Sequence, residues 1–121
     1  MPDDAGPRAI DDAFVEAQVA RQRRIWLLLL KRGPRRDQPS DEVDRLQAAH
    51  LRHLFTLQER GQLTLFGPVE GDRTVRGIGV LIVETRAEAE ALMADDPMVL
   101  AGRLRAEVRP WFTLPGMGPP E

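Results

Sequence analysis

The pattern of apolar residues along the chain predicts its strands and helices. Residues 25–30 read IWLLLL, and an unbroken apolar run of this length is typical of a strand covered on both faces. Near the end of the chain, Leu104, Ala106 and Val108 alternate with charged residues, which predicts a strand with one wet face. Two further strands are expected at 62–68, with Leu63 and Leu65 on one face and Thr64 and Phe66 on the other, and at 76–84.

Helical spacing and end signals predict two longer helices and a weaker third. The first should run from Ser40, whose hydroxyl can cap the free backbone amides, and stop just before Gly61. The second should start at the capping box Thr85-Arg86-Ala87-Glu88 and end at Asp96, since the residue before a proline resists helical geometry. A short amphipathic helix is expected within residues 8–22, outside the main fold.

The order of these segments is strand, helix, strand, strand, helix, strand. Such a βαββαβ unit is the ferredoxin-like α+β fold, in which a four-stranded antiparallel sheet carries both helices on one face. The strands at 25–30 and 78–83 are nevertheless apolar on both faces. A bare apolar sheet face is unusual in a soluble monomer, so we expect a homodimer that packs sheet to sheet.

Composition limits the number of domains, the kinds of partner and the compartment to be expected. The 121 residues suit one domain, and we expect an N-terminal extension at 1–23, the main domain at 24–113 and a Pro/Gly-rich tail at 114–121. The net charge of −2 and the lack of interleaved arginines and aromatics do not favour nucleic-acid binding. The chain has no cysteine, no basic leader and no apolar run long enough to cross a bilayer, so we expect a cytoplasmic protein.

The helix expected at 40–60 raises the main chemical question, because a histidine lies on its apolar face. On a helical wheel of about 100° per residue, His50 falls within roughly 20° of the centre of the stripe formed by Val43, Leu46, Leu54 and Leu57. An inward imidazole needs a partner, since burial of an unpaired polar group is costly. His50 is therefore either a packed histidine satisfied by a neighbour or a general base in a pocket.

Five stretches of the chain, taken together, resemble the YCII-related (YciI-like) family. They are AAHLRHL (48–54), ERGQLTLFGPV (59–69), GIGVLIVET (77–85), ADDPMVLAG (94–102) and EVRPWF (107–112). The resemblance implies a dimeric α+β barrel and a catalytic His–Asp pair, which falls here on His50 and Asp96. Chemistry known or suspected in the family includes elimination, such as dehydrochlorination, and the fold is shared with muconolactone isomerases. Some relatives carry an arginine shortly before the histidine, where this chain has Gln47; if that arginine holds an anionic substrate, a different substrate class is expected here.

The predicted function follows from these residues. Asp96 would hold one ring nitrogen of His50 and leave the other to take a proton, which is sufficient for elimination or isomerisation. No glycine-rich phosphate loop is found, which argues against nucleotide binding, and no serine stands in a nucleophile elbow. Proton transfer by a His–Asp pair needs no redox cofactor, so no cofactor is expected. We therefore expect a cofactor-free lyase or isomerase acting on a small organic substrate, anionic or halogenated. The alternative is a non-catalytic ligand-binding or regulatory module.

The roles of several other features are less well determined by the sequence. His50 and His53 have an H-x-x-H spacing, but no third ligand motif accompanies them, so no metal site is predicted. The basic loop KRGPRR at 31–36 is either a lid that attracts an anion or a solvated turn. Trp111 is expected either in a pocket wall or in the dimer contact, whereas Gly67-Pro68 should shape a turn beside the pocket.

Overall fold

The computed structural model of the protein describes residues 8–114. The chain divides into two compact units: Arg24–Trp111 is one, and the segments on either side of it belong to the other. In the second unit, α1 (Asp12–Ala20) is the expected short helix, and its cap residue Asp11 accepts a hydrogen bond from the Phe14 amide at 2.9 Å. None of the side chains of α1 is buried. Most of the predicted tail, residues 115–121, lies outside the described residues.

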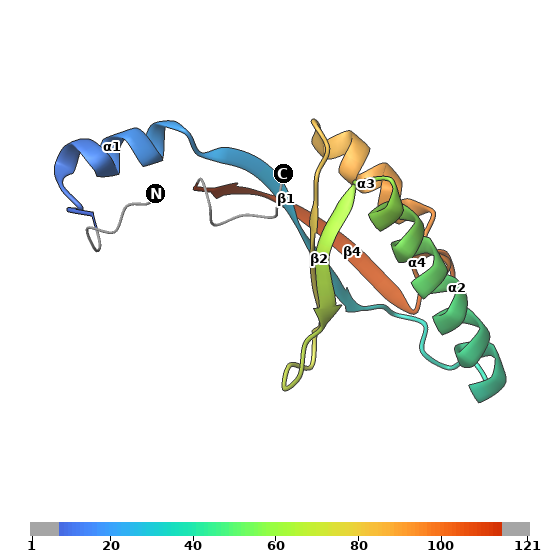
Figure 1. The fold of residues 1–121 in the computed structure, drawn as a ribbon. Coiled ribbons are helices and arrows are strands. Elements are labelled where there is room, and N and C mark those ends of the chain that lie inside the picture. Colours follow the sequence, from blue (N-terminus) through green and yellow to red (C-terminus); the bar gives the residue numbers. More distant parts are fainter. Residues whose placement is uncertain (1–7, 115–121) are drawn as a thin grey trace. The chain divides into compact units, whose positions relative to one another are not determined.

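The larger unit contains a four-stranded antiparallel sheet in the order β2-β3-β1-β4, with three helices on one face (Figure 1). This arrangement confirms the predicted α+β, ferredoxin-like βαββαβ fold. The elements of the fold are β1 (Arg23–Arg32), α2 (Ser40–Glu59), β2 (Leu63–Pro68), β3 (Val75–Leu81), α3 (Arg86–Ala94), the short α4 (Pro97–Leu100) and β4 (Leu104–Thr113). Among the described residues, no helix has the length and apolar character needed to span a membrane.

The core lies between the sheet and the helices. Alternate residues of β1 point towards the helices, where burial of each large apolar side chain stabilises the fold by about 1.5–3 kcal/mol. Leu27 and Leu29 lie on the opposite face of β1 and are only half-buried. The cluster that fills the core comprises Trp26, Leu28, Leu30, Leu54, Leu57, Leu63, Leu81, Ala89, Met93 and Val108.

Local signals placed the helix ends correctly, with one exception. Thr85 and Glu88 form both reciprocal bonds of the capping box, and Gly61 takes the left-handed conformation expected after a helix, at φ 73°. Ser40, however, is the first residue of α2 and not its cap. Pro39 occupies the cap position without a side-chain hydrogen bond, so the prediction for Ser40 was wrong.

A second prediction was wrong, because Leu63 and Leu65 do not lie on the same face of β2. Leu63 is 1% exposed and lies in the core, whereas Leu65 is 73% exposed. The pairing of β2 with β3 shifts register between Leu63 and Phe66, so Phe66 also packs against the core. An irregularity of this kind breaks the alternation of side chains that the sequence pattern assumed.

Candidate functional site

His50 and Asp96 meet inside the larger unit. Helical periodicity places His50 on the inner face of α2, one turn before the buried Leu54, and its side chain is largely buried. Its Nδ1 atom lies 2.7 Å from Oδ2 of Asp96, which is 0% exposed. An ionised Asp96 can only accept hydrogen bonds, so with that carboxylate the Nδ1 atom of His50 carries the proton of this contact.

Asp96 is held in place by its own backbone context. It caps α4, and its Oδ1 atom accepts a hydrogen bond from the Met98 amide at 2.9 Å. Pro97 follows at the first helical position, where its fixed φ angle suits the start of a helix. The neighbouring Asp95 is exposed. One carboxylate oxygen therefore anchors the backbone while the other orients His50.

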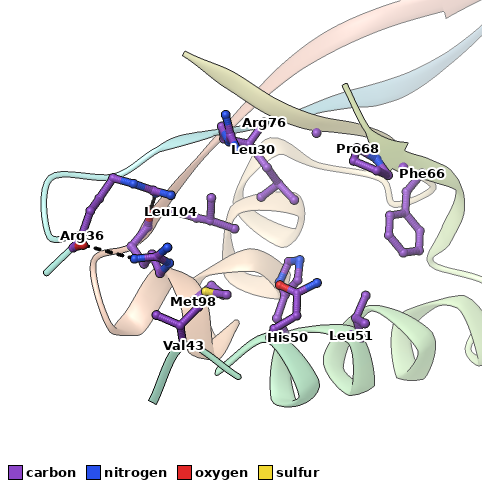
Figure 2. A pocket seen from close by; sticks show the side chains of 14 residues that line it. Leu30, Arg36, Val43, His50, Leu51, Phe66, Pro68, Arg76, Met98 and Leu104 are labelled. Atoms are coloured by element: carbon purple, nitrogen blue, oxygen red, sulfur yellow. Dashed lines mark hydrogen bonds between the residues drawn. The ribbon is translucent and has the colours of Figure 1, made fainter. Parts of the chain in front are cut away.

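The second nitrogen of His50 takes no part in the contact with Asp96. Within residues 8–114, Nε2 of His50 has no hydrogen-bond partner, and the side chain lines a cavity of about 330 Å³. Figure 2 shows His50 projecting from α2 towards the strands, opposite Leu30. This volume lies at the lower end of the range for small-molecule sites. The lining residues are Leu30, Arg36, Val43, Gln47, His50, Leu51, Phe66, Gly67, Pro68, Arg76, Gly77, Met98, Arg103 and Leu104.

The cavity is strongly basic. Its lining includes Arg36, Arg76 and Arg103 but no aspartate or glutamate. Burial, together with the positive charges of Arg103, Arg32 and Arg76, lowers the pKa of Arg36 from its ordinary value. The rest of the wall is mostly apolar. The arrangement favours a small organic molecule that carries negative charge.

The basic loop between β1 and α2 is tied to the turn before β4, and one of its residues, Arg36, lines the cavity. The Gly33 and Arg35 amides donate to the carbonyls of Arg103 and Gly102, at 2.8 and 2.9 Å. A side chain at position 33 would bring its Cβ within 2.3 Å of the Gly102 carbonyl oxygen, so only glycine fits. These contacts hold Arg36 at the cavity.

His53 does not join His50 in a common site. Its Nε2 atom donates to the Leu92 carbonyl at 2.8 Å and so links α2 to α3. Among the described residues, no group of three or more His, Cys, Asp or Glu side chains could hold a metal ion. His53 therefore has a structural contact of its own.

Sequence reasoning missed part of the cavity. Arg76 and Arg103 were not singled out, and Gly67 and Pro68 line the cavity instead of forming a turn beside it. Trp111 does not belong to the lining. The run of arginines at 31–36 pointed towards an anion, but nothing along the chain indicated which of them would reach the cavity.

Together, the fold and the site define a small α+β domain with a buried His–Asp pair at a basic cavity. The model of the YCII-related domain family matches residues 25–112, and the chain belongs to this family. A search of curated proteins found no match.

A solved structure with the same fold is the 5-chloro-2-hydroxyhydroquinone dehydrochlorinase TftG from Burkholderia phenoliruptrix AC1100, in complex with 2,5-dihydroxybenzoquinone. The two chains are 24% identical and superpose with a TM-score of 0.52. The match covers 70% of this chain and 92% of the dehydrochlorinase chain. At this identity the likeness establishes the fold.

Proposed function

We propose that the protein is a cofactor-free lyase or isomerase that moves a proton on a small anionic organic compound. His50 is the general base and Asp96 is its positioning residue. One observation carries the proposal: Asp96 holds Nδ1 of His50, while Nε2 faces a cavity without a partner among the described residues.

The proposed reaction needs only a base and a carboxylate that orients it. The Nε2 lone pair takes a proton from a carbon next to a carbonyl or similar activating group, and the Asp96 carboxylate stabilises the resulting imidazolium. In an elimination, the electron pair of the broken C–H bond forms a double bond as a leaving group departs with its own pair. In an isomerisation, the imidazolium returns the proton to another atom of the substrate. A positioned base of this kind contributes about 10²–10⁴-fold to the rate.

The arginines support the same chemistry from the other side of the cavity. Removal of a proton leaves negative charge on the substrate, and guanidinium groups already in place stabilise that charge as it develops. The same fold carries the dehydrochlorinase TftG, which agrees with a lyase reaction.

We further propose that the protein is a homodimer that packs through its sheets. Within Arg24–Trp111, no helix covers the sheet face opposite α2 and α3 (Figure 1). Ile78 of β3 pairs with Leu29 of β1 on that face and is 43% exposed. A second copy of the sheet would remove these apolar side chains from water.

The test of catalysis is proton exchange in D₂O, followed by NMR, with a panel of small carbonyl acids and halogenated ring acids. The wild type should exchange or convert at least one compound, and His50→Gln should lower that rate by about 10²-fold or more. His53→Gln is the matched control and should keep the rate, because His53 lies outside the cavity lining.

Two results would contradict the proposal. Turnover that survives His50→Gln unchanged would remove the general base. Binding of compounds in the cavity with neither exchange nor conversion would favour the alternative, a non-catalytic ligand-binding module.

A further inference from the structure

Arg76 reaches the cavity because β3 has an irregularity at that residue. Leu30 of β1 pairs with Gly77, but the next residue, Lys31, pairs with Val75, so Arg76 is an extra residue on β3. In a regular strand, consecutive side chains point to opposite faces. Here both Arg76 and Gly77 line the cavity. β-Bulges redirect side chains in this way and are common beside active sites.

Arg76 is exposed, and its guanidinium has no partner among residues 8–114. No hydrogen bond or ion pair joins its side chain to any residue in the described range 8–114, and no acidic side chain lines the cavity. The register shift therefore places an arginine without an internal ion pair at the rim of a basic cavity.

Hydrogen bonds join Arg36 and Arg103 into a second positive group. Arg36 Nη1 donates to the Arg103 carbonyl at 2.6 Å, and Arg103 Nη1 donates to the Arg36 carbonyl at 3.3 Å and to Gln38 Oε1 at 3.1 Å. Each guanidinium is therefore fixed through one nitrogen. Its other nitrogens have no partner among the described residues and can take a carboxylate in the paired geometry that arginine favours.

The two groups come from different elements of the fold. Arg76 belongs to β3, whereas Arg36 lies on the loop before α2; Figure 2 shows Arg76 next to Leu30 and Arg36 on that loop. The pKa of Arg36 is lowered first by burial and then by its positive neighbours, Arg76 among them. A bound anion would relieve this crowding of like charges.

We infer that the cavity has two anion subsites, Arg76 and the Arg36–Arg103 pair, and that its substrate is a small organic molecule with two carboxylate-like groups. The carbon skeleton between those groups lies against His50. The inference rests on the proposed function, because it names the substrate class of the same site. Arg76 is then the residue that selects diacids over monoacids.

The test uses the full-length protein and calorimetric titration at low ionic strength. The probes are the 1,2-, 1,3- and 1,4-benzenedicarboxylates, which hold two carboxylates at three separations, with benzoate as the monoacid. Phenyl phosphate carries both of its charges on one group. Tighter binding of phenyl phosphate than of the dicarboxylates would therefore indicate a phosphate site and not a site for two carboxylates. At least one dicarboxylate should bind about tenfold or more tightly than benzoate and phenyl phosphate.

Arg76→Gln should lower the affinity of that dicarboxylate by about tenfold, to the level of benzoate, and leave benzoate binding unchanged. Arg73→Gln is the matched control, because Arg73 is exposed on the same β2–β3 hairpin and does not line the cavity. It removes the same charge and should leave every affinity unchanged.

Three results would overturn the inference: equal binding of benzoate and all dicarboxylates, tighter binding of phenyl phosphate, or equal losses in Arg76→Gln and Arg73→Gln. Calorimetric binding and exchange in D₂O are separate measurements on the wild type, so the inference and the proposed function can fail independently. If diacids bind as expected but undergo no His50-dependent reaction, the substrate-class inference stands as a ligand class and the catalytic proposal fails.

Discussion

Nδ1 of His50 and Oδ2 of Asp96 lie 2.7 Å apart, although 46 positions separate the two residues in the chain. Each residue is also part of a regular local structure. His50 is on the inner face of α2, and Asp96 is the cap of α4. The pair thus joins two elements of the fold and fixes which imidazole nitrogen faces the cavity.

Asp96→Asn should reverse the tautomer of His50 with little change in the fold. The amide oxygen can still accept from the Met98 amide, while the amide nitrogen would donate to Nδ1 and so leave the proton on Nε2. The base would then be lost, and any His50-dependent rate should fall by about 10²-fold or more. Long-range ¹H–¹⁵N NMR of the imidazole rings measures the tautomer directly, without a substrate.

Asp95→Asn is the control for this experiment, because Asp95 is exposed and should not affect His50. His53 provides an internal reference, since its Nε2–H group donates to Leu92 in both variants. An unchanged Nδ1–H tautomer in Asp96→Asn would show that Asp96 does not orient the ring.

Leu63→Ala and Leu65→Ala should differ sharply in stability, although alternation alone places the two leucines on one face. Leu63 is fully buried in the core, so its truncation should cost about 2–5 kcal/mol of unfolding free energy. Leu65 is largely exposed, and its truncation should cost no more than about 0.5 kcal/mol. Urea unfolding monitored by tryptophan fluorescence measures both. Similar losses would mean that β2 has the regular register predicted from sequence.

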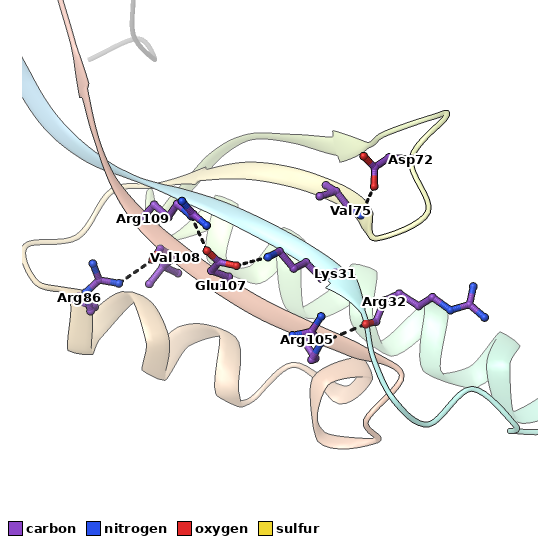
Figure 3. Close-up of polar contacts among 9 residues, drawn as sticks. All are labelled: Lys31, Arg32, Asp72, Val75, Arg86, Arg105, Glu107, Val108 and Arg109. Carbon is purple, nitrogen blue, oxygen red and sulfur yellow. Dashed lines mark hydrogen bonds and ion pairs between the residues drawn. The ribbon is translucent and has the colours of Figure 1, made fainter.

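Glu107 should make the fold more stable above its pKa than below it. Hydrogen bonds from Lys31 and then Arg109 lower the pKa of Glu107 in the folded protein (Figure 3). Because the folded pKa lies below the unfolded value, this contribution is fully present above the unfolded pKa, at about 4.3 for glutamate. It is lost as the pH falls through the folded pKa.

Glu107→Gln should therefore lower stability at neutral pH and have little effect under strongly acidic conditions. Urea unfolding at a series of pH values measures the difference between variant and wild type. The control is Glu90→Gln, since Glu90 is exposed and has no ion pair among the described residues. A difference from wild type that stays constant with pH would contradict the role of the Lys31–Glu107–Arg109 contact.

Ile78→Glu should convert the proposed dimer into monomers. The substitution would place a charge in the middle of the bare sheet face, where its burial in an apolar contact is costly. Sedimentation velocity at micromolar concentration measures the state of assembly. Leu100→Glu is the matched control, because Leu100 of α4 is 72% exposed and lies on the helical side of the fold. A monomeric wild type, or equal effects of the two variants, would rule out packing through the sheets.

Much of the fold follows from short-range signals. The apolar run at 25–30, the capping box at Thr85 and the left-handed Gly61 each depend on neighbours within a few positions, so the pattern alone predicted the corresponding elements. The inward direction of His50 was predictable for the same reason, because helical periodicity determines which face a side chain occupies.

The cavity depends on contacts between distant segments. Arg36, Arg76 and Arg103 come from a loop, a strand and the turn before another strand, and no spacing along the chain links them. The register shifts near Phe66 and Arg76 arise from pairing between strands, which local alternation does not encode. Periodicity and caps are properties of neighbouring residues, so they determine elements and faces. Only the packing of those elements decides which charges share a cavity, because that depends on register and close contact across the whole domain.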